Sequence, residues 1–268
     1  MASIKQQYDA QGFYLNVAQR LPAELIRRST AGMMAIRRGE YDTGRPPEES
    51  GWNPGDSEDV LCKIEQPQFA SRAVLELVSH PLLGQIAAEA TGAQWVQVWW
   101  VQLLFKPPSR QATAGGTNIG WHQDRNYWQR WEEGSELFTA WVALSDVTIE
   151  AGPMIFVRGS HRWGFLPGSD FHGQDLQQIK SSISVPPGEN WEEIPAVLPP
   201  GGFSLHDDLT WHGSGANLSH SPRMAFAIHM RTEKSLPIGD AREGLTKYID
   251  DTAVCPIIFN GQTRSAAP

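Results

Sequence analysis

From Trp95 onward the chain is a succession of short segments with strand character, and this pattern limits the folds that it can adopt. The segment WVQVWWVQLLFK is rich in Val, Trp and Phe, and comparable segments follow it: IGWHQD, ELFTAWVALSDV, GPMIFVRG, FSLHDD, TWHGSG and PRMAFAIHMRT. Clusters of Gly, Pro, Asp and Ser separate them. Short runs of β-branched and aromatic residues between turn residues are typical of strands. Many such strands in one chain predict a sandwich or barrel.

The residues before this point have helical character. Helix-like apolar spacing follows Pro22 in AELIRRSTAGMMAIRR, and residues 69–91 predict two short helices that meet at a His-Pro pair. Residues 40–57 are polar and rich in Gly and Pro, which predicts a loop between the helices.

The length and composition suit one packed domain, with 268 residues of which 40% are hydrophobic and 19% charged. We expect a single domain over residues 1–268, with a helical part at about 1–92 and a β core at about 93–235. A long polar insertion occupies residues 165–190, and insertions of this length are often lids over a site. The sequence leaves open whether this segment and residues 40–57 are lids or surface loops.

Charge and hydropathy restrict the partners and the location. The formal net charge is −8 and no cluster of five or more basic residues occurs, which argues against nucleic acid or an anionic membrane as a partner. No apolar run approaches the ~20 residues of a membrane span, and MASIKQQYDA lacks the apolar core of a signal peptide. We therefore expect a soluble, cytoplasmic protein that binds a small molecule; the sequence specifies no oligomeric state. Cys62 and Cys255 are too few for a disulfide framework or a thiolate metal cage, so each is expected to be a small buried hydrophobe.

A candidate metal site begins at Trp121-His122-Gln123-Asp124. On a strand, residues i and i+2 point to the same face, so His122 and Asp124 project together and Gln123 points away. One imidazole and one carboxylate supply two ligands, and a histidine from a distant strand is expected to supply the third. Two histidines and one carboxylate leave open the positions that Fe(II) oxygen chemistry uses. By itself an H-x-D pair is weak evidence, because two surface side chains are its usual explanation.

Six histidines follow Asp124. Four lie in less suitable contexts, in a turn, in the polar insertion, in a Ser-rich loop and on the strand described next: His161, His172, His220 and His229. His206 and His212 remain, and the residues alone do not separate them.

A candidate anion site lies on the strand RMAFAIHMRT. Alternation places Arg223, Ala225, Ala227 and His229 on one face. A guanidinium beside two small residues leaves room for a ligand, and arginine binds a carboxylate through two parallel hydrogen bonds. A dicarboxylate that chelates iron through a 2-oxo acid group can reach Arg223 with its other end. A structural ion pair is the alternative, and the strand taken alone favours it.

Three segments together resemble a known family. WHQD, AGPMIFVRGSH and LHDDLTWHGSGANLSHSPR are similar to the phytanoyl-CoA dioxygenase-like branch of the Fe(II)/2-oxoglutarate oxygenases, and the resemblance runs roughly from Trp95 to Arg231. It implies a double-stranded β-helix, a jelly roll of two sheets with flanking helices. In the motif W-H-G-S-G-x-N-x-S-x-x-x-R the histidine is the family's distal iron ligand and the arginine binds 2-oxoglutarate. The resemblance therefore implies His212, rather than His206, as the third ligand and Arg223 as the co-substrate residue.

The resemblance also implies further co-substrate residues: Ser214 with Arg223 at the far carboxylate, Trp141 against the co-substrate, and Gln102 and Lys106 lining the same pocket. For Trp141 a place in the core is an equal alternative. The chain departs from the family at Arg158, where Pro-Gly-Ser-His usually begins, which puts the rigidity of that turn in doubt. Asp124 is retained, and this disfavours the related halogenases, which have a small residue there.

The implied cofactors are Fe(II), 2-oxoglutarate and O2. The expected reaction is oxidation, most often hydroxylation, of a small hydrophobic or aromatic metabolite, with release of succinate and CO2. Desaturation, cyclisation and epimerisation are alternatives, as are a non-catalytic module that binds metal or 2-oxoglutarate and a metalloenzyme that uses no 2-oxoglutarate. The chain holds eleven tryptophans, and the candidate substrate contacts are Trp128, Arg125, Tyr127 and His206. A buried core position is the alternative for His206.

Overall fold

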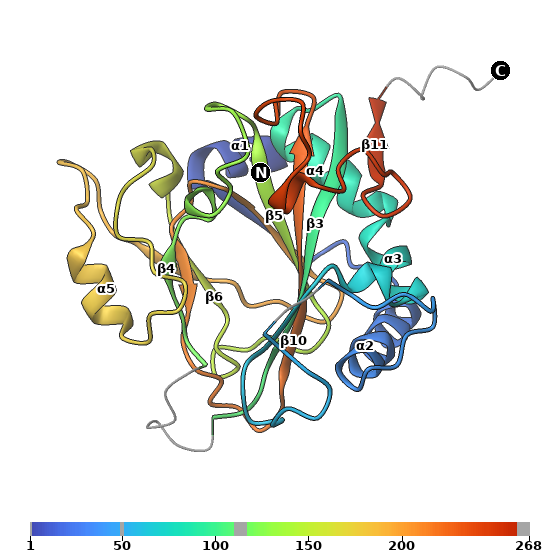
Figure 1. Cartoon of the computed structure of the whole chain (residues 1–268). Helices are drawn as coiled ribbons and strands as arrows, with labels where there is room; N and C mark the ends of the chain where they lie inside the picture. The colour runs from blue at the N-terminus through green and yellow to red at the C-terminus, as the bar shows by residue number, and fades with distance from the viewer. Residues whose placement is uncertain (1, 49–50, 110–116, 262–268) are drawn as a thin grey trace.

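The computed structural model describes residues 2–48, 51–109 and 117–261. Two antiparallel sheets face each other (Figure 1). The larger has the order β1-β8-β5-β10-β3-β11, with β2 also paired to β3, and the smaller has the order β4-β9-β6-β7. The larger sheet is built from β1 (Phe13–Asn16), β2 (Cys62–Glu65), β3 (Trp95–Lys106), β5 (Leu137–Ala143), β8 (Phe203–Asp207), β10 (Arg223–Thr232) and β11 (Ile257–Asn260). The smaller is built from β4 (Ile119–His122), β6 (Met154–Val157), β7 (Glu193–Pro195) and β9 (His212–Ser214).

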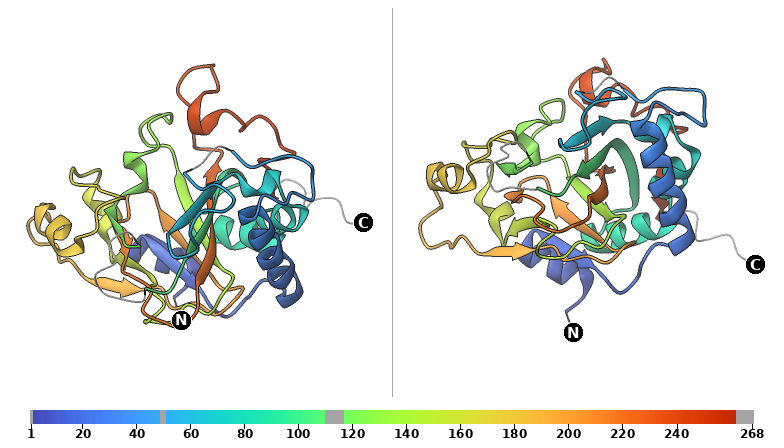
Figure 2. Two further views of the ribbon diagram at one scale, coloured as in Figure 1. Left: turned by 60° about the horizontal axis from the view of Figure 1, so that its bottom comes forward. Right: turned by 90° about the horizontal axis from the view of Figure 1, so that it is seen from below.

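Helices cover the outer face of the larger sheet, and α5 lies on the opposite side of the molecule (Figure 2). The helices are α1 (Ile4–Gln11), α2 (Ala23–Arg37), α3 (Arg72–Val78), α4 (Pro81–Thr91) and α5 (Leu176–Ser182), with short 3₁₀ turns η1 (Pro67–Phe69), η2 (Asp124–Asn126), η3 (Ser160–Trp163) and η4 (Gly244–Thr246). Apolar residues of α2 to α4 and the outward side chains of β3 and β10 form one buried cluster. The expected helices and the β-rich core are confirmed, and the two facing sheets are the jelly roll that the resemblance implies.

The larger sheet draws three strands from outside residues 93–235, namely β1, β2 and β11. Each has only four residues, which is too short for a period of two to stand out in the sequence. The insertion at 165–190 is also not wholly irregular, because it contains α5. Asp175 caps this helix by accepting hydrogen bonds from the N–H groups of Gln177 and Gln178.

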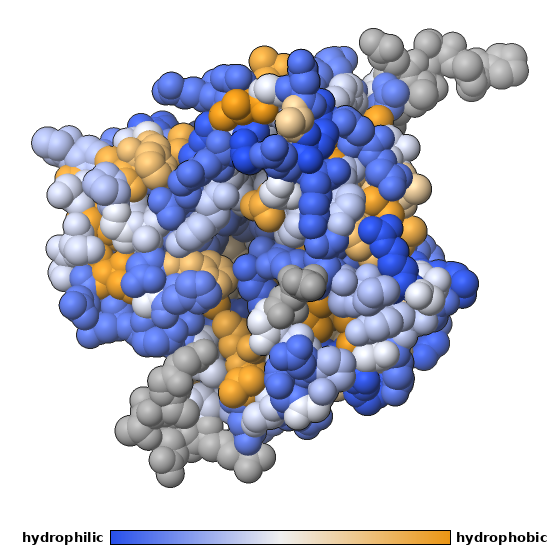
Figure 3. Space-filling view, viewed as in Figure 1, coloured by the Kyte–Doolittle hydropathy of each residue, from blue (hydrophilic) through white to orange (hydrophobic). Residues whose placement is uncertain are grey.

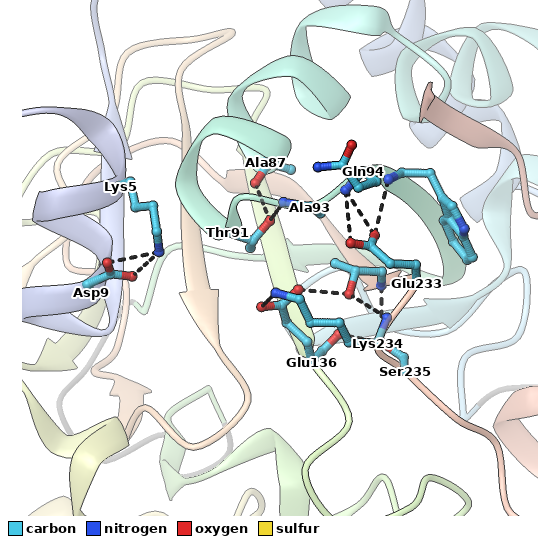
Figure 4. Close-up of polar contacts among 12 residues, drawn as sticks. Lys5, Asp9, Ala87, Thr91, Ala93, Gln94, Glu136, Glu233, Lys234 and Ser235 are labelled. Carbon is cyan, nitrogen blue, oxygen red and sulfur yellow. Dashed lines mark hydrogen bonds and ion pairs between the residues drawn. The ribbon is translucent and has the colours of Figure 1, made fainter. Parts of the chain in front are cut away.

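A carboxylate fixes one end of the longest strand pair. Directly after β10, Glu233 accepts hydrogen bonds from the backbone N–H groups of Gln94 and Trp95 at the start of β3 (Figure 4). This joins the ends of two strands that are paired along ten residues of β10. The register of the inward-facing side chains on these strands is fixed as a result.

Two further expectations concern the cysteines and the membrane. Cys62 and Cys255 are both buried free thiols, as expected. Among the described residues, none of the helices combines the length and the apolar character that crossing a bilayer requires.

Candidate active site

Two side chains from the smaller sheet and one from the turn that follows β4 converge between the two sheets. β4 ends at His122, Gln123 remains extended, and Asp124 begins the turn η2. The extended conformation of Gln123 keeps the alternation that the sequence predicts, although Asp124 itself is not on a strand. His212 opens β9 and is directly paired with His122. The Nε2 atoms of both histidines lie 3.7 Å from Oδ1 of Asp124, and the three ligand atoms lie within 4.8 Å of one another.

The protonation of these groups suits metal binding. Each histidine directs Nδ1 at a backbone oxygen, His122 at Gly120 (2.7 Å) and His212 at Thr210 (2.9 Å). A carbonyl can only accept, so Nδ1 carries the proton and Nε2 keeps its lone pair. Burial lowers the pKa of both histidines, which favours their neutral form. Burial alone would raise the pKa of Asp124, but the neighbouring imidazoles, His212 first, outweigh it and hold this pKa well below its usual value. Neutral imidazoles and an ionised carboxylate are the forms that bind divalent metals.

The expected outward direction of Gln123 is also observed. Its side chain is fully buried. The amide nitrogen donates to the backbone oxygens of Gly164 and Leu209, and the amide oxygen accepts from the N–H of Leu166. Gln123 therefore ties the strand between the two metal-ligand candidates to two neighbouring loops.

The inner face of the larger sheet supplies a second group of predicted residues. Arg223 begins β10 and is paired with Lys106 at the end of β3. Lys106 is fully buried, and its Nζ donates to Ser214 Oγ and to the Gly215 oxygen, both at 2.7 Å. Arg223 donates to the Gly152 oxygen, while its buried Nε has no hydrogen-bond partner among the described residues.

Neither cation is paired with a carboxylate of the described residues. Burial alone lowers the pKa of Arg223 to about 9, and burial followed by repulsion from Arg223 lowers the pKa of Lys106 well below its usual value. No ion pair links a carboxylate to either cation within the described residues. Buried charges are normally paired, so this end of the cavity is suited to an anionic ligand. The structural ion pair that is the alternative for Arg223 is therefore not found within residues 2–48, 51–109 and 117–261.

The cavity between the sheets joins the two groups. Its lining includes the three metal-ligand candidates together with Arg223, Ser214, Trp141, Gln102 and His206. Arg223 lies over the Trp141 ring, 5.2 Å from its centroid. Lys106 is not part of the lining but lies behind Ser214. Because Ser214 Oγ accepts the hydrogen bond from Lys106, its own hydroxyl proton is free to be donated to a ligand.

Three of the candidate substrate residues do not line this cavity. Trp128 is buried, with its ring 4.9 Å from that of Trp99. Arg125 donates to the backbone oxygens of Trp131 and Glu132. Tyr127 is 42% exposed, and its hydroxyl accepts a hydrogen bond from the N–H of Phe171. The turn η2 redirects the chain directly after Asp124. These three residues are therefore close to Asp124 in sequence but lie outside the cavity lining.

An outer groove continues the cavity toward the surface, which is hollowed near its centre in the space-filling view (Figure 3). The groove and the cavity share three residues: Leu61, Ile119 and Phe171. The rest of the groove is lined by Gly51, Trp52, Val60, Lys63, Glu65, Asn118, His172 and Gln174. Both segments considered as lids, 40–57 and 165–190, thus border the groove; residues 49–50 lie outside the described residues.

Sequence reasoning missed Thr139, which lines the cavity beside His229. The Thr139 hydroxyl lies 2.9 Å from Asp124 Oδ2 and 2.8 Å from His229 Nδ1. Alternation in ELFTAWVAL puts Thr139 on the same face as Trp141, and this signal could have indicated it. The sequence predicts His229 on the same face as Arg223 but does not favour it as a metal ligand.

Gly120 is expected to tolerate no side chain. A Cβ atom at this position would lie 1.9 Å from the Asp170 oxygen, and the Gly120 N–H donates to the Phe171 oxygen while its carbonyl accepts from His122. We expect Gly120→Ala to push away the segment at 170–171, to lower stability by about 1–3 kcal/mol, as overpacking does, and to weaken metal binding. Thermal unfolding and Co(II) titration measure the two effects.

The matched control is Gly51→Ala, because no atom of the described residues, chain neighbours aside, lies within 4 Å of the position its Cβ would take. Equal behaviour of the two variants would contradict the steric argument at Gly120.

A family comparison identifies the chain. The model of the phytanoyl-CoA dioxygenase family matches residues 8–225. The chain belongs to the phytanoyl-CoA dioxygenase family. This confirms the resemblance carried by the WHQD and WHGSG segments.

Individual relatives of this phytanoyl-CoA dioxygenase family member are distant. The dioxygenase andF of Emericella variicolor is 24% identical over 199 residues, covering 70% of this chain and 63% of the relative; the chain thus spans less than two thirds of that protein. Among solved structures, the carbocyclase SnoK from nogalamycin biosynthesis superposes with a TM-score of 0.66 at 23% identity, over 91% of this chain and 89% of SnoK. The epimerase SnoN, solved with Fe3+, alpha-ketoglutarate (2-oxoglutarate) and nogalamycin RO, has a TM-score of 0.64 at 23% identity, over 87% and 83% of the two chains. These structural likenesses support the fold.

Proposed function

We propose that the chain is an Fe(II)/2-oxoglutarate-dependent dioxygenase that oxidises a small molecule. One observation carries this proposal: three ligand-ready side chains line the same cavity as a buried guanidinium that forms no ion pair with a carboxylate among the described residues. A metal site alone fits many enzymes, and a buried arginine alone fits many folds. Their combination fits a metal ion and a dicarboxylate bound next to each other.

His122, Asp124 and His212 would hold the iron. Three protein ligands on one side leave the remaining positions open for co-substrate and O2. When bound, the iron supplies an oxidation in which 2-oxoglutarate and O2 become succinate and CO2 while a substrate C–H bond is oxidised. The protein itself would bind the metal ion, the co-substrate and the substrate, orient them and exclude wasteful reactions.

The far carboxylate of 2-oxoglutarate would bind Arg223 and the hydroxyl of Ser214. Lys106 supports this position from behind by holding Ser214 Oγ and adds a second positive charge. Trp141 and Gln102 form the walls of the cavity between the carboxylate end and the metal end. Charge-assisted hydrogen bonds in a buried site are among the stronger polar interactions, which suits selection of a dicarboxylate.

The substrate would enter by the outer groove. Its walls combine the aromatic rings of Trp52 and Phe171 with an ion pair between Lys63 and Glu65 at 3.0 Å. Such a lining suits a small metabolite with an apolar or aromatic body and one polar or charged group. Hydroxylation is the proposed outcome. Desaturation, cyclisation and epimerisation are alternatives; the structural relatives SnoK and SnoN are named as a carbocyclase and an epimerase.

A non-catalytic module that only binds 2-oxoglutarate is the second candidate. The ligand-ready protonation of all three metal-ligand candidates favours the enzyme, because binding a dicarboxylate alone requires no such metal centre.

Succinate formation tests the proposed function. Protein with Fe(II), 2-oxoglutarate and O2 is incubated with a panel of small metabolites, and succinate is measured against an Asp124→Ala control. Succinate above that control with at least one compound supports the enzyme. Binding of 2-oxoglutarate under anaerobic conditions without any succinate supports the binding module. The absence of 2-oxoglutarate binding favours a metalloenzyme that does not use it.

Leu61 tests the groove, because it borders both the groove and the cavity. We expect Leu61→Trp to obstruct the passage and raise the KM of a substrate found in the panel by at least about tenfold, the effect of losing about 1.4 kcal/mol. The affinity for 2-oxoglutarate should stay unchanged, because Arg223 and Ser214 lie at the other end. Ile149→Trp, at a position that is 58% exposed and outside both linings, is the control. Equal KM values for the two variants would exclude entry through this groove.

A further inference from the structure

The two oxygens of the Asp124 carboxylate have different surroundings. Oδ1 faces the Nε2 atoms of His122 and His212, at 3.7 Å from each. Oδ2 instead accepts a hydrogen bond of 2.9 Å from the hydroxyl of Thr139 on β5. His206 Nε2 is also near Oδ2, at 3.4 Å, but neither of its ring nitrogens makes a hydrogen bond within the described part of the chain.

The donor and acceptor roles in the hydrogen bonds of Thr139 can be assigned. The hydroxyl of Thr139 has a single proton, and it donates this proton to Asp124 Oδ2. The 2.8 Å contact between Thr139 Oγ1 and His229 Nδ1 then requires His229 to be the donor. The chain of donors runs from His229 through Thr139 to Asp124 Oδ2.

The larger sheet holds this chain of donors in place. Thr139 on β5 and His229 on β10 are direct partners in the antiparallel register. The ring of His229 lies 4.8 Å from that of Trp128 and 5.5 Å from that of Trp99. The ladder between β10 and β3 is irregular directly after His229. Aromatic contacts and a fixed register thus leave the imidazole little freedom to rotate.

We propose that Thr139 and His229 are positioning residues that hold Oδ2 of Asp124 away from the metal, so that the carboxylate binds it through Oδ1 alone. The proposal rests on the proposed function, since it assumes a metal held by Asp124. A carboxylate that used both oxygens would occupy one more coordination position. The hydrogen bond from Thr139 therefore helps to keep a position open for co-substrate or O2.

Co(II) titration of the whole chain tests the role of Thr139. Thr139→Val removes the hydroxyl at nearly constant shape, whereas Thr139→Ser keeps it. We expect Thr139→Val to weaken Co(II) binding about 10- to 100-fold, as loss of an outer-shell partner does, and to change the ligand-field spectrum because Asp124 changes its mode of binding. Thr139→Ser should retain the spectrum of the natural protein and its affinity to within about threefold, since the hydroxyl remains. Thermal unfolding of each variant reports whether the fold is intact.

His229 provides a second, independent measurement. In His229→Asn the amide nitrogen can replace Nδ1 as the donor, whereas His229→Leu has no donor. We expect the Asn variant to keep the Co(II) spectrum and the Leu variant to shift it as Thr139→Val does. Because both residues act through one chain, the double variant Thr139→Val/His229→Leu should be only slightly worse than either single variant.

The results of the Co(II) titrations distinguish a failure of the positioning role from a failure of the proposed function. Unchanged Co(II) affinity and spectrum in Thr139→Val would overturn the positioning role, as would fully additive effects in the double variant. If Thr139→Val does not fold, the Asn and Leu variants of His229 decide in the same way. Failure of the natural protein to bind Co(II) would instead contradict the proposed metal site.

Discussion

Replacement of His212 by alanine is expected to abolish Fe(II) binding and succinate formation, whereas replacement of His206 by alanine leaves Fe(II) binding within about tenfold. Both side chains are buried and line the same cavity. His212 has its Nδ1 bonded to a backbone oxygen, so the lone pair of Nε2 is available beside Asp124 Oδ1, whereas Nδ1 of His206 has no such partner among the described residues. The loss at His212 should exceed the roughly 10- to 100-fold that follows loss of an outer-shell partner, because a direct ligand disappears.

Anaerobic titration with Fe(II) measures the difference between the two variants, with thermal unfolding as the check on folding. His206 lies 3.4 Å from Asp124 Oδ2, so a modest effect of His206→Ala is consistent with the assignment. The reverse order, with Fe(II) binding lost in His206→Ala and kept in His212→Ala, would move the third ligand to β8 and overturn the proposed site.

The distinction between these two histidines shows how far local sequence reasoning reaches. The spacing of His122 and Asp124 is a local property, and the extended backbone at Gln123 realises it as expected. The proposed third ligand, His212, reaches this position because β4 is paired with β9, some 90 residues later in the sequence. No periodicity encodes that pairing. The family motif supplied His212, and the register of the smaller sheet brings it beside His122.

The contacts around Asp124 likewise depend on which strands are neighbours, which periodicity does not encode. Strand alternation placed His229 on the inner face, but the direct partnership with Thr139 follows from β5 lying next to β10 in the sheet. Trp128 is the opposite case: it is close to Asp124 in sequence, yet its ring packs against Trp99 in a separate buried cluster. The sequence predicts which segments form strands and which side chains share a face of the sheet. It does not predict which strands are neighbours in the sheet.

Replacement of Arg223 by methionine is expected to weaken 2-oxoglutarate binding strongly without loss of stability. Truncating one partner of a buried, hydrogen-bonded charge pair costs about 2–5 kcal/mol, which corresponds to about 30- to 4,000-fold in Kd. In the free protein, however, Arg223 is a fully buried cation whose Nε has no partner among the described residues, and burial lowers its pKa to about 9. An apolar side chain of similar volume at such a position is often neutral or stabilising, so the melting temperature should be equal or higher.

Arg231 on the same strand is the matched control for Arg223. It donates to Gln97 and lies over the ring of Trp95, away from the cavity. Arg231→Met should therefore leave 2-oxoglutarate binding unchanged and lower stability, the opposite pattern to Arg223→Met. Arg223→Lys should fall between the natural protein and Arg223→Met, because lysine keeps the charge but cannot form two parallel hydrogen bonds with a carboxylate. If Arg223→Met kept both the natural requirement for 2-oxoglutarate and full turnover, the guanidinium would not bind the co-substrate. A metalloenzyme independent of 2-oxoglutarate would then become the better description of the cavity.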